Sequence, residues 1–265
     1  MNRRAALKMG ALGGITLTAG CNGVRSGSAS ASDATFLPPV VAEGALEGWA
    51  QVGDVQETEL DVPVPGLSVY QSMALFENRA FLEEMSTLAM ADISAPLSTF
   101  FVTRVNFVGP LGGVAVPDLV ETQVTPVVKD QLRSQGVEDL GERRPATGSV
   151  EKTDDLYAIE GAFHVDGQTM RGYPLPDGKT TEVTVEAATV DMRLVYGIWA
   201  PRSGEVYVAG GAFPTSPYQS VSDPVSLTGD DETGVTVTAE VSLPLDRPDH
   251  RGALLSLVDA VGERG

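Results

Sequence analysis

Two histidines, His164 and His250, are the side chains of this 265-residue chain best suited to proton transfer near neutral pH. Neither stands in a metal-ligand spacing such as His-Glu-x-x-His. His164 falls in an expected strand next to Asp166, on the face opposite Phe163, and is interpreted as a surface residue in preference to a base or a metal ligand. His250, beside Asp249 in the first turn of an expected helix, is also expected to be exposed. The histidines therefore indicate no catalytic residue and no metal site.

Two further patterns that could bind phosphate or cations lack the required spacing. The string from Gly172 to Thr181 resembles a phosphate-binding loop, but Asp177 stands where such a loop needs glycine, and two prolines remove amide donors. The acidic strings Asp154-Asp155 and Asp230-Asp231-Glu232 lack the alternation of a calcium-binding loop. The sequence contains no G-x-S-x-G nucleophile elbow. We expect no cofactor and a protein that is not an enzyme, since catalysis would have to depend on carboxylates alone.

The single cysteine, Cys21, has the most specific chemistry in the chain. It closes the string Leu17-Thr18-Ala19-Gly20-Cys21 after a short apolar stretch, which is the pattern of a lipid attachment site behind a cleavable leader. The alternative is a buried thiol in an intact N-terminus. We expect a signal peptide over residues 1–20, with membrane lipid attached through Cys21 and the rest of the chain held at the extracytoplasmic face of the cell membrane.

The leader also indicates an export route. Arg3, Arg4, Leu7 and Lys8 match a twin-arginine signal, although Ala6 stands where a bulky residue is usual, so the general route remains an alternative. The uncharged run over residues 9–20 is shorter than the roughly 20 residues that a membrane-spanning helix needs. It is therefore expected to be a signal core and not a membrane span.

Residues 21–33 are expected to form a flexible tether behind the lipid. They are small and polar, with many serines, and contain nothing from which a core could be built. A flexible chain of about 12 such residues spans on the order of 20 Å. The tether would therefore keep the following domain close to the bilayer without fixing its orientation.

The chain is strongly acidic. Its 18 basic and 36 acidic residues give a net charge of −18, and loss of the leader with its three basic residues would leave 15 against 36, a net charge of −21. This charge repels nucleic acid and anionic headgroups, so no nucleic-acid partner is expected. Few lysines and many acids are typical of proteins adapted to molar salt, where the Debye length is about 3 Å. A salt-rich habitat is therefore expected.

Residues 34–265 are expected to form one extracytoplasmic domain, with a change of character near residue 148. Before this point the pattern predicts a short helix at 42–49, strands at 67–77 and 97–108, and helices at 81–90 and 118–135, the last interrupted by Thr125-Pro126. After it the pattern predicts strands at 156–165, 181–190, 192–199, 205–213 and 234–243, and a final helix at 249–261. Pro201-Arg202-Ser203-Gly204 predicts a hairpin between two of these strands.

The second half also contains a weak internal similarity. Leu156–Phe163 aligns with Val206–Phe213 at an offset of 50 residues, with four of eight residues identical. A duplicated strand-loop-strand unit would explain it. Chance recurrence of glycine, alanine and valine in a valine-rich sheet explains it equally simply and is the preferred interpretation.

With its leader, lipidated cysteine, serine-rich tether and acidic body, the chain resembles the uncharacterised twin-arginine lipoproteins of halophilic archaea. The leader match is specific, and the body match rests on the order of strands and helices from Leu97 to Phe213-Pro214. The resemblance implies an anchor in the outer leaflet of an archaeal membrane and an antiparallel sheet similar to PsbP-like domains. It implies no known activity and no catalytic residues.

The sequence therefore predicts an α+β fold, an antiparallel β-sheet packed on one face by two or three helices. The function expected first is that of a non-catalytic accessory or binding module for a membrane protein complex, supported by an unpaired sheet edge or an apolar patch. A small-solute or ion-binding lipoprotein with a pocket of convergent polar groups is the alternative. A carboxylate-based hydrolase is the third and least favoured.

Overall fold

The computed structural model describes residues 36–60, 65–89, 93, 95–109, 117–174, 180–226, 236–238 and 240–262. Several features singled out in the sequence lie outside these ranges. They are the expected leader with Arg3, Arg4, Leu7 and Lys8, the expected lipid site Cys21, the expected tether, the loop at 175–179 and the acidic string at 229–232. The structure therefore bears on the region from Phe36 onward.

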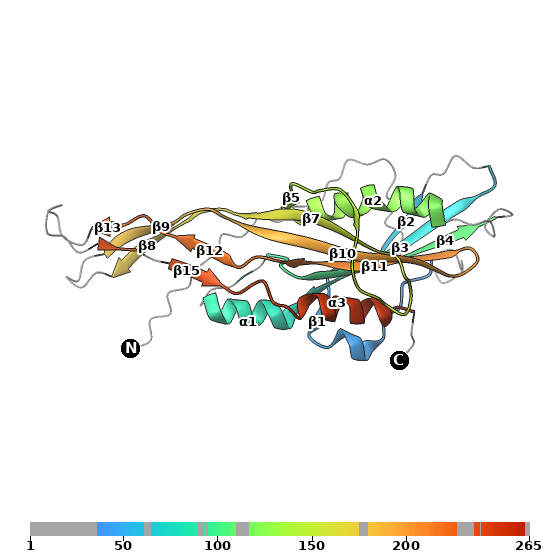
Figure 1. Ribbon diagram of the computed structural model, residues 1–265, viewed down its shortest axis with the longest axis horizontal. Helices are drawn as coiled ribbons and strands as arrows, with labels where there is room; N and C mark the ends of the chain where they lie inside the picture. Colours follow the sequence, from blue (N-terminus) through green and yellow to red (C-terminus); the bar gives the residue numbers. More distant parts are fainter. Residues whose placement is uncertain are drawn as a thin grey trace.

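A nine-stranded antiparallel sheet forms the centre of the molecule (Figure 1), which confirms the predicted α+β class. The strand order is β1-β3-β4-β11-β10-β7-β5, with β2 also paired to β3 and β6 also paired to β7. Strands from both sides of residue 148 join in this sheet through β4 and β11. The strands are β1 (Trp49–Gln51), β2 (Gln56–Leu60), β3 (Ser68–Asn78), β4 (Thr99–Val108), β5 (Val137–Glu138), β6 (Arg144–Pro145), β7 (Leu156–Val165), β10 (Ala188–Arg202) and β11 (Glu205–Pro214).

Three short two-stranded sheets extend one end of the molecule into an arm, seen at the left of Figure 1. They pair β8 (Gln168–Pro174) with β9 (Thr180–Val185), β12 (Tyr218–Val221) with β15 (Glu240–Leu243), and β13 (Val225–Ser226) with β14 (Thr236–Val237). Two predicted strands divide here, since 181–190 is split between β9 and β10 and 234–243 between β14 and β15. The first break is where the chain passes from the arm into the central sheet, and the second lies between two of the small sheets of the arm.

The hairpin between β10 and β11 is confirmed. Its ladder runs from Met192 opposite Pro214 to Trp199 opposite Tyr207, shifts register, and closes with Arg202 opposite Glu205. Gly204 in the turn has a φ of +77°, a left-handed conformation that glycine adopts without steric cost. The turn string identified in the sequence therefore forms the end of the longest hairpin of the sheet.

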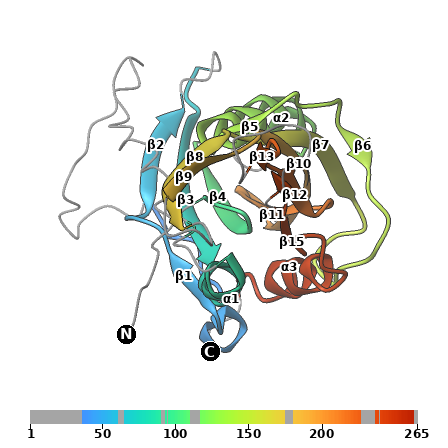
Figure 2. The ribbon, with the colours of Figure 1, turned by 90° about the vertical axis from the view of Figure 1, so that its left-hand side faces the viewer.

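The helices lie on both faces of the sheet, whereas the sequence had predicted helices on one face. Helix α2 (Pro117–Ser134) packs on one face and α3 (His250–Asp259) on the other (Figures 1 and 2). Helix α1 (Arg79–Ala89) lies beside β15 and β1, and its buried side chains belong to the same core as those of α2. The physical reason is that β4 and β11 are buried on both faces, so each face needs its own cover. Neighbouring residues of β4 show this, because Phe101 belongs to the core under α2 and Phe100 to the core under α3.

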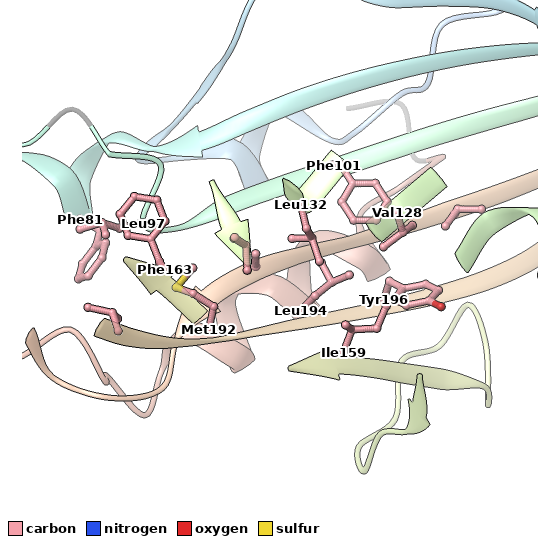
Figure 3. Close-up of a cluster of buried hydrophobic side chains, with 14 of the residues drawn as sticks. Phe81, Leu97, Phe101, Val128, Leu132, Ile159, Phe163, Met192, Leu194 and Tyr196 are labelled. Atoms are coloured by element: carbon pink, nitrogen blue, oxygen red, sulfur yellow. The ribbon is translucent and has the colours of Figure 1, made fainter. Parts of the chain in front are cut away.

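Two hydrophobic cores result from this arrangement. The first, shown in Figure 3, joins Val128 and Leu132 of α2 to Phe101, Leu194 and Tyr196 of the sheet. The second lies on the opposite face, where α3 packs on β11 and β10. Its helical side chains are fully buried, namely Leu254, Leu257, Val258 and, just past the helix, Val261. The predicted apolar stripe of the last helix is thereby confirmed.

Differences from the predicted elements are local. The helix expected over 42–49 is a single 3-10 turn (Glu43–Leu46) followed by β1. The strands that were not predicted are β1, β2, β5, β6, β8, β12 and β13. Pro126 lies inside α2, which continues through it. Gly262, with a φ of +81°, follows α3, and Asp249 at the start of the helix makes no side-chain capping hydrogen bond. Element types were thus predicted better than their ends.

Candidate docking site

An open apolar groove lies between α2 and the strands at one side of the sheet. Its helical wall consists of Val124, Val127, Val128 and Gln131, and its floor includes Phe101, Val105 and Val208 of β4 and β11. The far wall is formed by β3 and by Leu60 of β2. Because α2 lies beside β5 and over β10 and β11, it leaves the apolar surface of β3 and β4 partly uncovered. The groove is the result.

The size of the groove limits what it can hold. Its volume is about 80 Å³, well below the roughly 300 to 1,000 Å³ of typical small-molecule sites. Val127 at its rim is 46% exposed, and three polar side chains, Gln71, Thr103 and Gln131, interrupt the apolar lining. A space of this size suits one or two apolar side chains of another molecule better than an entire cofactor.

Strand β2 borders the groove and is the outer strand of the sheet. It pairs with β3 from Gln56 opposite Met73 to Leu60 opposite Val69, and its other edge is paired with no strand in the described part of the chain. Leu60 and Thr58 lie on the groove face, because directly opposed residues share a face. Glu57 and Glu59 lie on the other face. An unpaired edge and an apolar groove therefore adjoin each other.

The first described residues of the chain, from Phe36 onward, lie beside this edge. The ring of Phe36 packs edge-on against Tyr70 at 5.1 Å between centroids, and Tyr70 lies opposite Glu59 of β2. A guanidinium nitrogen of Arg104 donates a hydrogen bond of 3.4 Å to the Pro38 carbonyl. The segment that follows the expected tether is thus held against the same side of the sheet as β2.

A buried polar cluster occupies the opposite face of the same strands. Nε of Arg104 lies 2.8 Å from one carboxylate oxygen of Glu205. The other carboxylate oxygen of Glu205 pairs with Arg202 across the hairpin turn. Only 9% of Arg104 and 5% of Glu205 are exposed. Ser72 and Asn106 are buried beside them, and their Oγ and Nδ2 atoms have no hydrogen-bond partner in the described part of the structure. Little of the cluster faces solvent, so Arg104 and Glu205 form a buried ion pair with incompletely satisfied polar neighbours.

Tyr207 adjoins this cluster on β11. Burial raises the pKa of the Tyr207 hydroxyl above its ordinary value, the charge of Arg104 opposes the rise, and the carboxylate of Glu205 adds to it. The Arg104 guanidinium lies 5.8 Å from the centre of its ring, and Trp199 stacks on it at 5.5 Å. Trp199 packs at the edge of the core under α3 and is partly buried.

Sequence reasoning missed both the groove and the polar cluster. Arg104 stands inside the apolar strand β4, and Glu205 begins the equally buried β11. A charged residue in a strand buried on both faces is the signal that could have identified the pair, since such a charge needs a partner. The groove left no comparable signal, because valine and phenylalanine line covered and uncovered parts of a sheet alike.

The two histidines have different environments. His164 is on the surface as predicted, with Nδ1 3.0 Å from the Thr189 hydroxyl and Nε2 3.7 and 3.9 Å from the carboxylates of Asp139 and Glu138. His250, in contrast, is buried, which corrects the expectation that it is exposed. Its ring lies 4.5 Å from that of Phe81 and 6.2 Å from that of Phe213, and Nε2 lies 3.0 Å from the Leu245 carbonyl. The turn before α3 folds back onto α1, and this contact encloses the ring.

The burial of His250 predicts a pH dependence of stability. Burial lowers its pKa below the ordinary value of 6.5; the hydrogen bond to Leu245 and the charge of Asp249 oppose this, and the charge of Arg247 adds to it. As the pH falls, His250 of the unfolded chain binds a proton before His250 of the folded chain does. The contribution of the neutral, buried His250 to the free energy of unfolding is therefore fully present above about pH 6.5 and decreases as the pH falls below it. Urea unfolding should show that the free energy of unfolding falls more between pH 7.5 and pH 5.5 for the wild type than for His250→Phe. His164→Gln is the control and should behave like the wild type. Equal decreases in the wild type and in His250→Phe would contradict this prediction.

Comparison with protein-family models, curated proteins and solved structures finds no match to this chain. Within the described residues, none of the helices has the length and hydrophobicity needed to cross a membrane. The same residues contain no group of three or more histidine, cysteine or acidic side chains placed to hold a metal ion. Function must therefore be inferred from the groove, the edge strand and the pockets themselves.

Proposed function

We propose that this protein is a non-catalytic accessory module, anchored to the extracytoplasmic face of the membrane through Cys21, that docks onto an extended segment of a membrane protein. The observation that carries the proposal is the apolar groove beside the unpaired edge of β2. In this mode of recognition the partner adds a strand to the sheet. Its main chain provides hydrogen bonds, and its side chains provide specificity.

The chemistry of the partner segment follows from the two faces of β2. In an added strand, alternate side chains point to opposite faces of the sheet. Those on the face of Leu60 would reach toward the groove, where the lining favours leucine, valine or isoleucine. Those on the other face would meet Glu57 and Glu59, where lysine or arginine is favoured. We therefore expect a segment in which apolar and polar or basic residues alternate.

The position of the tether supports a partner in the membrane. Residue 33, where the expected tether ends, is three residues from Phe36, a distance of at most about 11 Å. Phe36 packs beside the β2 edge. A tether that spans on the order of 20 Å would therefore keep this edge near the bilayer surface, at high effective concentration relative to a membrane-embedded partner.

Photo-crosslinking tests the proposal. A photoreactive residue placed at Leu60 in cells should form an adduct with a membrane protein, and the crosslinked peptide should have the alternating pattern described above. In molar salt, Val127→Glu should reduce the adduct at least tenfold, because it places a charge at the rim of the apolar groove. Leu88→Glu is the matched control, since Leu88 is 52% exposed on another helix, and it should leave the adduct unchanged.

Cys21→Ala separates the anchor from the docking surface. If the lipid supplies effective concentration only, this variant should give a weaker adduct with the same crosslinked peptide. An adduct that is insensitive to Val127→Glu, or that maps to several unrelated proteins, would show that the groove is not a docking site. Recovery of Cys21→Ala in the membrane fraction at the wild-type level would show that the lipid anchor is absent.

A further inference from the structure

A second pocket, of about 200 Å³, lies on the face of the sheet opposite the groove. The segment around β6 forms one wall and contributes Arg144, and Arg251 of α3 is also in the lining. Arg193 of β10 lines it as well, next to the small side chains of Ala158 and Val195. Three guanidinium groups from three different elements therefore line one pocket.

Two of these three arginines have no ion pair among the described residues, which is unusual in so acidic a chain. Arg79, Arg104, Arg133, Arg193, Arg202 and Arg247 each form an ion pair with an acidic side chain. Arg143 lies over the ring of Tyr157 at 4.4 Å. Arg144 and Arg251 have no ion pair or hydrogen bond of their side chains within the part of the chain that the structure describes, and both line this pocket. With 36 acidic residues against 18 basic ones, partners are plentiful, so two unpaired guanidinium groups in one pocket call for an anion.

The acidic residues of the pocket do not neutralise it. Glu160 is engaged by Arg193, with 2.9 Å between a guanidinium nitrogen and a carboxylate oxygen. Glu142 also lines the pocket but is exposed on the segment before β6. Three arginines and two glutamates leave a local charge of +1 on a protein whose total charge is −18. The pocket is therefore a local positive site on a negative surface.

The backbone at Gly148 closely approaches the end of the Arg251 side chain. A Cβ atom at Gly148 would lie 2.9 Å from a guanidinium nitrogen of Arg251, and Gly148 has a φ of +117° that glycine readily adopts. The close approach of this glycine gives the guanidinium room beside the turn. Arg144 is placed by the pairing of β6 with β7, opposite Ala158, on the same face as Val195. Both side chains thus come from fixed backbone positions.

We propose that this pocket binds a small oxyanion, a phosphate or a carboxylate-bearing solute, between Arg144 and Arg251. The guanidinium group presents paired N–H donors that match the two oxygens of a carboxylate or phosphate. Chloride offers the fork only one acceptor atom, whereas a carboxylate or phosphate offers two oxygens, so the site should retain its ligand in molar salt better than a diffuse positive surface would. The inference is independent of docking at the groove, which lies on the other face.

Isothermal titration calorimetry on the full-length protein in detergent tests this inference. Inorganic phosphate and succinate are titrated separately, in dilute buffer and in 2 M potassium chloride, so that the two ligand sources are distinguished. We expect one of them to bind with a dissociation constant below about 1 mM and to lose less than tenfold in affinity at high salt. Arg251→Gln and Arg144→Gln should each weaken binding at least tenfold.

Two controls make the outcome decisive. Arg133→Gln removes an exposed arginine of α2 that pairs with Asp130 and should leave the affinity unchanged. Arg251→Lys keeps the charge but loses the paired donors, and it should bind more weakly than wild type. Thermal unfolding of each variant verifies that it is folded. The proposal fails if neither anion binds to the wild type, or if Arg251→Gln and Arg133→Gln bind equally well. The crosslinking outcome at the groove is unaffected by either result.

Discussion

Replacing Glu205 by alanine is expected to lower the free energy of unfolding by about 3 to 5 kcal/mol, which is the range for a buried ion pair that loses one partner. Arg104 would remain buried with its positive charge uncompensated, because the nearest carboxylate, 2.8 Å from its Nε, is the one removed. The hairpin turn would also lose the pairing of Arg202 with Glu205. For a domain of this length the melting temperature should fall by roughly 6 to 20 °C.

The double variant Arg104→Met, Glu205→Leu is the matched control. It removes both charges and leaves apolar side chains in their place, and such replacements are often neutral or stabilising. Urea unfolding of the wild type, Arg104→Met, Glu205→Leu and the double variant gives the coupling between the two positions. If Glu205→Ala proves no less stable than the double variant, the pair is not the buried, mutually dependent unit described above.

Gly211→Ala is expected to cost about 3 kcal/mol or more, at the upper end of the range for overpacking a core. A Cβ atom at this position of β11 would lie 2.2 Å from the Thr99 carbonyl oxygen of β4 and 2.4 Å from a methyl carbon of Leu254 in α3. The carbonyl oxygen belongs to the backbone of a paired strand, so it cannot move aside without disturbing the ladder. Helix α3 would have to shift away from the sheet.

Gly252→Ala serves as the control for this substitution. Gly252 lies in α3 itself, and a Cβ atom added there meets no atom within 4 Å. Alanine has a higher helix propensity than glycine by up to about 1 kcal/mol, so this variant should be slightly more stable than wild type. Opposite shifts of the urea midpoint for Gly211→Ala and Gly252→Ala are therefore expected. Two shifts of the same sign would mean that close packing of α3 on β11 does not limit stability.

Most strands and helices could be predicted because their signals are local. The run of phenylalanine and valine in β4 and the turn before Glu205 indicate strands and a hairpin by residue type alone. The apolar spacing of α3 and the glycine that follows it mark a helix and its end. The short edge strand β2 (Gln56–Leu60) escaped prediction, since its sequence, Gln-Glu-Thr-Glu-Leu, is polar and pairs on one side only.

The candidate sites could not be predicted in the same way. The groove depends on how far α2 extends across the sheet, and the arginine pocket depends on bringing Arg144, Arg193 and Arg251 together from positions up to 107 residues apart. His250 shows the same limit, because its neighbour Asp249 suggested an exposed helix start, whereas packing against Phe81 and Phe213 buries the ring. Burial is a property of contacts between distant segments, and spacing along the chain does not contain it.

The sequence by itself determined the α+β class, the pairing of β10 with β11, the acidic charge and the absence of a recognisable catalytic motif. It also provided the expectation of a lipid anchor at Cys21. These features depend on residue type and short-range spacing. Only the tertiary structure decided that helices cover both faces of the sheet, that an apolar groove adjoins the outer edge of β2, and that two arginines without an ion pair among the described residues share a pocket. Each of these depends on which surfaces remain uncovered after the strands and helices have packed.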